Sequence, residues 1–268
     1  MEAALPGRNG NARVLELDPE LGLRIPADEI SRARQQLVAP VLELPAGHWD
    51  VPHGDGSHGR LGFLILEGLL ARDMTLAGRT ATELLGEGDV VQPWLAQREE
   101  GLVPYRVGWH VLMPVRVAIL DDAFARSLAR WPQVMSTLLE RAVRRTHRMS
   151  IHEALLQLSP VETRLLVLFW HLAERWGHVT PAGIALRLRL PHALLGQLVG
   201  CRRASVTTAL QHIYGTGDLA RREDGTWLLH GEPPDEFVSL HWDVGSNVTP
   251  HAGRRRVQVR DMRSQARP

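Results

Sequence analysis

The feature that most constrains the fold is residues 190–229, which read as two short helices joined by a tight turn and followed by a hairpin. Apolar residues at helical spacing give the first helix one buried face, formed by Leu194, Leu195, Leu198 and Val199. Gly200 ends this helix, because glycine readily adopts the left-handed geometry of a tight turn. The second helix has its own apolar face, formed by Val206, Ala209, Leu210 and Ile213.

The opposite side of the second helix carries hydrogen-bond donors near its N-terminus: Arg202, Arg203, Ser205, Thr207 and Thr208. A helix that enters DNA needs this polarity, since apolar residues hold it on its domain while polar residues reach base edges. Asp224 and Gly225 lie between two strand-like segments, 219–222 and 226–229, which indicates a hairpin. The alternative is an ordinary two-helix corner with an unrelated hairpin. The basic turn and the hairpin that follows favour a winged helix-turn-helix that binds nucleic acid.

Composition sets broad limits on the chain. Its 268 residues suffice for two modest domains, and 44% hydrophobic with 23% charged residues is typical of a globular protein. The single cysteine, Cys201, excludes a disulfide or a four-thiolate cluster within one chain. The sequence shows neither an apolar run of membrane-spanning length nor a secretion signal, so we expect a cytoplasmic protein without membrane contact.

The charge of the chain is unevenly distributed. Residues 1–130 have a net charge of −5, residues 131–230 have +5, and residues 231–268 have +1. An acidic first half is unsuited to a DNA-contacting face, whereas the basic second half can supply phosphate contacts. Solvated helix faces can produce a similar charge difference. The charge asymmetry therefore supports nucleic-acid binding only together with the winged helix-turn-helix pattern.

Two regions of different character precede the helical pair. Residues 1–12 are rich in glycine and asparagine and are predicted to be disordered. Short apolar runs punctuated by glycine follow, and they predict strands at 38–44, 61–66, 69–74 and 111–120. Glu67 and Gly68 are predicted to form a turn between two of these strands, with further turns at Gly78, 86–89 and Gly101. Residues 13–130 are therefore predicted to form an antiparallel β-roll.

Helices are predicted after Asp121 and Asp122, and Pro132 opens a long one within residues 131–158. Arginines cluster in its middle, at Arg141, Arg144, Arg145 and Arg148. A long helix with a thin apolar stripe is suited to pairing with a second copy of itself. The residues assigned to that dimer contact are Val134, Leu138, Ala142, Met149 and Leu156. The alternative is that the stripe packs on the chain's own roll.

The C-terminal domain is predicted to cover residues 159–231. Ser159 to Glu162 has the pattern of a capping box, which predicts a helix running to Trp176 with Gly177 after it. Residues 184–190 alternate apolar and polar side chains, as a half-exposed strand does. Residues 232–268 are rich in proline, glycine and arginine and are predicted to be a mobile tail.

The order of roll, long helix, capped helix and winged helix-turn-helix resembles the Crp/Fnr family of bacterial transcription regulators. The similarity is carried by residues 61–70, 86–91 and, most strongly, 194–210, and it spans residues 35–230. It implies an α+β fold with a cyclic-nucleotide-binding-like roll, a long dimerisation helix and a DNA-binding domain. It also implies double-stranded DNA, a second copy of the chain and RNA polymerase as partners.

The resemblance places the base-reading residues at Arg203, Ala204 and Thr208. The cyclic-AMP-type members carry Arg, Glu and Arg at these positions, so only Arg203 is retained and the preferred DNA sequence should differ. Arg203 can contact guanine through two hydrogen bonds. Arg202, Ser205 and Thr207 are better suited to phosphates, which orient the protein without specifying sequence.

The sensing region departs further from the family. Pro93 and Trp94 stand where the family has glycine and glutamate, and Arg98 precedes two acidic residues that would repel an anionic ligand. We therefore expect the roll to bind an unidentified effector other than cyclic AMP. The candidate effector-binding residues are Glu87, Gln92, Trp94 and Arg98. A constitutive regulator, whose roll is a ligand-free scaffold, is the main alternative.

A metal-dependent barrel enzyme is the third hypothesis. It rests on a glycine-rich loop that holds His48, Asp50, His53, Asp55 and His58. Cupin enzymes use a close His-x-His pair with a downstream glutamate on strands, which this sequence lacks. The loop is better explained as polar surface, and no catalytic triad or phosphate-binding glycine loop stands out. We therefore expect a protein without enzymatic activity, metal or cofactor.

Overall fold

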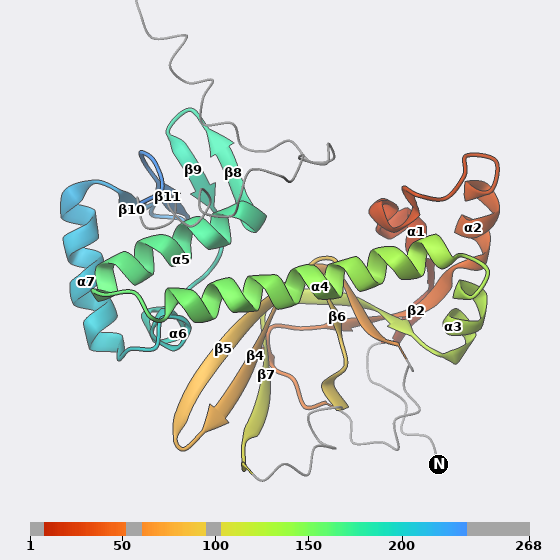
Figure 1. Cartoon of the computed structure of the whole chain (residues 1–268), viewed down its shortest axis with the longest axis horizontal. Coiled ribbons are helices and arrows are strands. Elements are labelled where there is room, and N and C mark those ends of the chain that lie inside the picture. Colours follow the sequence, from red (N-terminus) through yellow and green to blue (C-terminus); the bar gives the residue numbers. More distant parts are fainter. Residues whose placement is uncertain (1–7, 52–60, 95–102, 235–268) are drawn as a thin grey trace, which may run out of the picture. The chain divides into compact units, whose positions relative to one another are not determined.

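The computed structural model describes residues 8–51, 61–94 and 103–234. The chain divides into two compact units, residues 1–151 and 152–268, which are drawn together in Figure 1 and described separately below. Several residues named above, among them His53, His58 and Arg98, lie outside the described residues, as does the tail beyond 234.

The first unit is built on an antiparallel sheet, as predicted for an α+β chain with an N-terminal roll. Its strand order is β1-β2-β7-β4-β5, while β3 pairs with β7 and β6 with β4. The strands are β1 (Arg8–Arg13), β2 (Val38–Leu44), β3 (Gly47–His48), β4 (Gly62–Leu76), β5 (Arg79–Gly86), β6 (Val90–Val91) and β7 (Arg106–Leu120). One of its two apolar clusters holds Trp49, Phe63 and Trp109 among aliphatic side chains.

The predicted turn at Glu67 and Gly68 is wrong, because residues 62–76 form the single strand β4. The pairing of β4 with β7 shifts register around Glu67, which marks a β-bulge. Gly68 has φ 95°, and a Cβ on it would lie 2.1 Å from the backbone oxygen of Pro114. Glycine is therefore needed at this position for a bulge and a close backbone approach, which the sequence pattern does not distinguish from a turn.

The N-terminal segment also differs from the prediction of disorder, since residues 8–12 lie in β1 and pair with β2. An edge strand is held by backbone hydrogen bonds, so its polar side chains give no apolar signal. Three short helices cover the next residues: α1 (Val14–Leu17), the 3₁₀ helix η1 (Pro19–Gly22) and α2 (Ile30–Gln36). Their apolar side chains, including Leu15 and Leu21, join the second apolar cluster of the unit.

Two helices follow the sheet, α3 (Asp122–Leu128) and α4 (Pro132–Leu155). The predicted start at Asp121 is confirmed, because its carboxylate accepts a 2.9 Å hydrogen bond from the Phe124 N–H. The long helix also begins at Pro132 as predicted. Val134 and Leu138 are buried in the same apolar cluster as Phe124, so this face of α4 belongs to the core of the first unit.

Three arginines of α4, at spacings of four and three residues, pair with carboxylates of the first unit. Arg141 binds Asp18, with Nη2 2.8 Å from Oδ1. Arg145 binds both oxygens of Glu83 on β5, at 2.6 and 2.8 Å. Arg148 lies 2.7 Å from Asp89, a buried carboxylate that also accepts from the Gly86 N–H. Three of the four clustered arginines therefore hold α4 against the rest of the first unit, while Arg144 pairs with Glu140 of α4 itself.

Glu83 also pairs with Arg72, 2.8 Å away, so one carboxylate balances two partly buried guanidinium groups. We expect Glu83→Gln to lower the free energy of unfolding by about 2 kcal/mol, because it leaves charged partners without compensation. Urea unfolding followed by circular dichroism measures the change. The control is Glu16→Gln, which breaks an exposed pair with Arg13 and should cost less than about 1 kcal/mol. Equal effects of the two variants would contradict a stabilising role for the Glu83 pairs.

The second unit has the predicted winged helix-turn-helix. Its helices are α5 (Val161–Trp176), α6 (His192–Leu198) and α7 (Arg203–Thr216). Its antiparallel sheet has the order β10-β11-β9-β8, with β8 (Gly177–Thr180), β9 (Gly183–Leu186), β10 (Leu219–Arg221) and β11 (Trp227–Leu229). Phe169 of α5 packs on Trp227 of the hairpin, with ring centroids 4.7 Å apart. This contact joins the helices to the sheet.

Two local predictions in this unit need correction. α5 runs to Trp176 as predicted, but Pro160 is its N-cap, so Ser159 lies outside the helix and no side chain caps it. The predicted strand 184–190 ends at Leu186, because β11 pairs with only three residues of β9. Side chains beyond it still alternate, with Leu188 and Leu190 buried and Arg189 exposed. Within the described residues, every helix is too short or too polar to cross a membrane.

Candidate nucleic-acid interface

The helix-turn-helix is held by packing of α7 against α5 and α6. The predicted buried face of α7 is confirmed, since Val206, Ala209, Leu210 and Ile213 are all buried. The turn before it is tight: Gly200 has φ 66°, and a Cβ on Gly196 would lie 2.7 Å from the Cys201 backbone oxygen. Both glycines therefore have a structural role, which is to bring α6 and α7 close together.

The opposite face of α7 is exposed at its N-terminal end, where Arg202, Arg203, Ala204, Ser205 and Thr208 lie. Arg202 is the N-cap and makes no side-chain capping bond, so it leaves the first N–H groups of the helix without a side-chain partner from the cap. Thr207 differs from the others because its hydroxyl is engaged within the protein. It donates to the Arg203 carbonyl at 3.1 Å and lies 2.9 Å from Nδ1 of His192.

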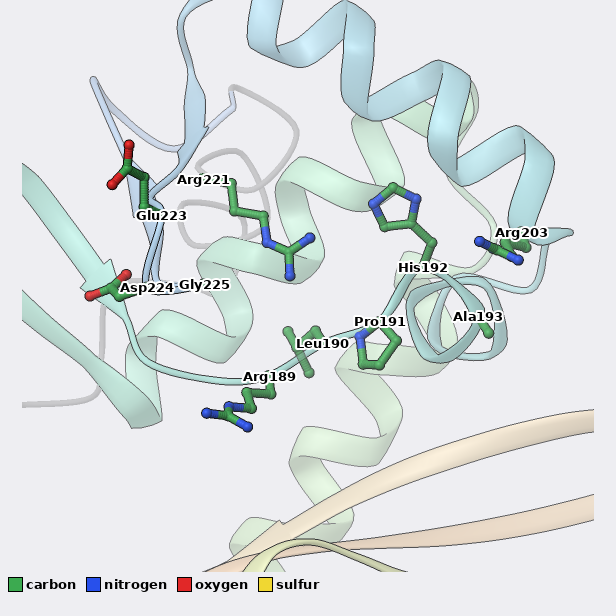
Figure 2. Close-up of a pocket in the computed structure, with 10 residues that line it drawn as sticks. All are labelled: Arg189, Leu190, Pro191, His192, Ala193, Arg203, Arg221, Glu223, Asp224 and Gly225. Atoms are coloured by element: carbon green, nitrogen blue, oxygen red, sulfur yellow. The ribbon is translucent and has the colours of Figure 1, made fainter.

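A cleft of about 670 Å³ opens beside the start of α7 (Figure 2). Its walls come from three segments of the second unit: residues 189–193 before and within α6, Arg203 of α7, and the hairpin residues 221 and 223–225. Figure 2 shows Arg221 and Arg203 on either side of His192. We name this site the cationic cleft.

Sequence reasoning missed three residues of the cationic cleft, namely Arg189, His192 and Arg221. The exposure of Arg189 could have been predicted from the sequence, because it alternates with the apolar residues Leu188 and Leu190. Arg221 lies on β10, with its guanidinium carbon 5.0 Å from the centre of the Trp227 ring. This cation–π contact orients the arginine toward the cleft, as only the folded hairpin reveals.

The cleft carries more positive than negative charge, with three arginines against Glu223 and Asp224. The Thr226 N–H donates to Asp224 at 2.8 Å, and this bond lowers the pKa of the Asp224 carboxyl and holds it in the turn. Burial, Arg221 and Arg203 together lower the pKa of His192 below its ordinary value. Guanidinium groups around a partly enclosed space are the groups that bind phosphate oxygens in proteins.

Three of the four residues assigned to effector binding lie among the described residues, and each has its own surroundings. Glu87 is exposed in the turn after β5, and Gln92 donates to the Leu61 carbonyl at 3.0 Å. Trp94 packs edge-on against Phe63, with ring centroids 5.5 Å apart, and Arg98 lies outside the described residues. The structure thus gives Gln92 and Trp94 internal contacts.

The residues assigned to the dimer contact fall on different faces of α4. Val134 and Leu138 lie in the core of the first unit and offer no surface to a second chain, while Leu156 is partly buried. Ala142 and Met149 are exposed. Three further apolar residues of α4 are also exposed on the side away from the sheet: Met135, Leu139 and Val143.

The histidine-rich loop is described only in part. His48 is 3.0 Å from Asp50, and its ring lies 5.1 Å from that of His110 on β7. His53, Asp55 and His58 lie outside the described residues. In the part of the chain that the structure describes, no three histidine, cysteine or acidic side chains are grouped as a metal site requires.

Comparison by sequence finds no matching family model and no matching curated protein. Comparison by structure finds similar folds. A cyclic nucleotide-binding domain containing protein from Listeria monocytogenes matches at TM-score 0.59 and 14% identity, over 82% of this chain and 99% of that one. The c-di-GMP responsive global regulator CLP from Xanthomonas campestris matches at TM-score 0.55 and 19% identity, over 77% and 100%.

A third structure similar to this chain carries the family name. It is a CRP-family transcriptional regulator from Thermus thermophilus, at TM-score 0.50 and 20% identity, over 76% of this chain and 96% of that one. The chain therefore has the fold of CRP/FNR-type regulators, with a sheet domain and a winged helix-turn-helix.

Proposed function

We propose that this chain is a sequence-specific DNA-binding transcription regulator that acts as a homodimer. The observation that carries the proposal is the exposed N-terminal half of α7, which lies beside the cationic cleft. An exposed helix with polar residues at its start can enter the major groove, and cations beside it can hold the DNA backbone. The shared fold of the solved regulators is consistent with this role.

Contacts divide into those that read bases and those that hold phosphates. Arg203, Ala204 and Thr208 are exposed on α7 and form the proposed base-reading set. Arg202 and Ser205 are assigned to phosphates, together with Arg189 and Arg221 of the cationic cleft. Thr207 is better described as a positioning residue, because its hydroxyl already bonds His192 and the Arg203 carbonyl.

The dimer contact is proposed to be the exposed stripe of α4. It consists of Met135, Leu139, Ala142, Thr146 and Met149, with Val143 beside it. The stripe positions are separated by four and three residues in turn, which is the spacing of a two-helix coiled coil. Two copies joined along α4 would present two α7 helices to successive major grooves about 34 Å apart, at a near-palindromic site.

The roll is proposed to sense an effector other than cyclic AMP. In support, Pro93 and Trp94 stand where the resemblance to the family implies the glycine and glutamate of a cyclic-nucleotide site. A constitutive regulator with a ligand-free roll is the second candidate. It is favoured by the internal contacts of Gln92 and Trp94.

Selection of bound fragments from a random DNA library, followed by footprinting, tests the proposed function. We expect enrichment of an inverted repeat whose half-sites lie about one helical turn apart. Absence of any enriched sequence would overturn the assignment. Titration with candidate effectors then separates the two candidates, because an effector must bind one conformation better than the other to change DNA affinity.

The double variant Arg189→Ala with Arg221→Ala is expected to weaken binding to all DNA sequences by a similar factor. Each lost phosphate contact should reduce the slope of log affinity against log salt by about 0.9. Fluorescence anisotropy at several salt concentrations measures both effects. Arg175→Ala, on α5 and outside the cationic cleft, is the matched control and should keep the parent slope. An unchanged slope in the double variant would exclude the cleft from the DNA contact.

A further inference from the structure

His192 occupies a defined place in the cationic cleft, at the first position of α6. Its Nδ1 lies 2.9 Å from the Thr207 hydroxyl oxygen, and that hydroxyl donates its hydrogen to the Arg203 carbonyl. A hydroxyl has one hydrogen to donate, so when Thr207 directs it to the Arg203 carbonyl its oxygen accepts from His192, and Nδ1 carries the hydrogen. We infer from this pattern that the neutral ring is the Nδ1–H tautomer.

The other ring nitrogen, Nε2, is therefore the atom that gains a proton when His192 becomes charged. Among the described residues none hydrogen-bonds to Nε2. The charged groups around the ring come from every wall of the cleft: Arg189 before α6, Arg203 of α7, and Arg221, Glu223 and Asp224 of the hairpin. Within this set, Arg221 and Arg203 disfavour a further positive charge on the ring.

We propose that His192 contacts a DNA phosphate as the imidazolium, so that DNA binding is accompanied by proton uptake at Nε2. The inference rests on the proposed function, since it assigns a phosphate to the cationic cleft. A phosphate between Arg203 and Arg221 would neutralise the two charges that now oppose protonation, and it would accept the new N–H as a charge-assisted hydrogen bond. Thr207 holds the ring in place in both states.

The sign of the pH dependence follows from this arrangement. In the free protein, burial and then Arg221 and Arg203 lower the pKa of His192, so the ring is neutral near neutral pH. In the complex, the phosphate raises that pKa. Between the two values, binding takes up a proton, so DNA affinity falls as pH rises. Below the lower pKa and above the higher one, His192 no longer makes the affinity depend on pH.

The test measures affinity for a duplex carrying the selected site, by fluorescence anisotropy at constant ionic strength from about pH 5.5 to 8, the range over which histidine titrates. We expect parent affinity to fall as pH rises within the window, by at most about tenfold per pH unit for each His192 that engages DNA, and so by at most about 100-fold per unit for a dimer on two half-sites. His192→Asn keeps a donor for Thr207 and should remove this dependence. His192→Arg, which is always charged, should bind tightly with a flat profile.

His178→Asn is the matched control, because His178 is exposed on β8 and outside the cleft; it should keep the parent profile. Nuclear magnetic resonance of the His192 ring, with and without duplex, gives an independent readout, and its pKa should rise on binding. A parent profile without pH dependence, or one unchanged in His192→Asn, would overturn the inference while leaving DNA binding intact. A chain that binds no duplex at any pH would instead overturn the proposed function, and the inference with it.

Discussion

Replacing Arg203 with alanine is expected to remove sequence preference at one base pair of each half-site. A guanidinium that donates two hydrogen bonds to guanine contributes about 1–3 kcal/mol of discrimination, and alanine has no donor to replace it. Affinity for the selected site should fall roughly 10- to 100-fold for each half-site, while affinity for unrelated DNA changes less. Competition assays with duplexes substituted at single positions measure the loss and locate the base pair.

Arg202→Ala is the companion variant, because Arg202 is also an exposed arginine at the start of α7. It should weaken binding evenly across sequences and reduce the salt dependence, as loss of a phosphate contact does. If Arg203→Ala keeps the parent preference at every position, the base-reading assignment is wrong. If the two variants exchange their effects, Arg202 is the base reader.

Leu139→Glu is expected to convert the proposed dimer to a monomer. Leu139 is 65% exposed at the centre of the α4 stripe, and a second glutamate would face it across a two-fold axis. Loss of the linked second half-site should lower DNA affinity by about 10²- to 10⁴-fold, which is the usual gain from joining two binding modules. Analytical ultracentrifugation measures the mass, and anisotropy measures the affinity.

The matched control is His147→Glu, which adds the same side chain at another exposed position of α4, outside the stripe. It should remain a dimer. Circular dichroism checks that both variants are folded. A large loss of helical signal in Leu139→Glu would show that it is misfolded instead of monomeric. A dimeric, well-folded Leu139→Glu variant would place the interface elsewhere.

Local patterns were sufficient for much of the fold. Gly200, the apolar spacing of α7 and the Asp224-Gly225 pair define the winged helix-turn-helix within about forty residues, because helix ends and hairpin turns depend on nearby residues. Three strands of the roll were predicted, β2 in full, β7 in part and β4 divided in two, whereas β1, β3 and β5 were not predicted as strands. A glycine at a bulge and a glycine at a turn look alike in one sequence, and only the Pro114 backbone distinguishes them.

The faces of α4 show why the rest could not be predicted. Val134 and Leu138 are followed immediately by Met135 and Leu139, so the sequence offers two apolar stripes on one helix. Which stripe faces the sheet is decided by partners far away in the chain, since Asp18, Glu83 and Asp89 pair with arginines on one side only. The sequence pattern therefore shows that α4 is amphipathic, but it does not show which of the two apolar stripes faces the sheet.

The cationic cleft was hidden for the same reason. Arg189, His192 and Arg221 belong to a linker, a helix and a strand, and each alone is an ordinary surface residue. They line one cleft only when the hairpin folds beside α6. The Thr207 hydroxyl is a related case, because the sequence favoured a DNA contact for it and the folded unit uses it to hold His192.

The three arginine–carboxylate pairs of α4 bear on how a signal could travel. Arg141, Arg145 and Arg148 fix the azimuth of the helix relative to the sheet, since any rotation about its axis breaks all three pairs together. If an effector moves this helix to a second setting, packed elements of this kind change in discrete steps. To drive it from 1% to 99% in a second setting, an effector must prefer that setting by about 5.5 kcal/mol. A molecule that binds both settings equally well would not shift the equilibrium.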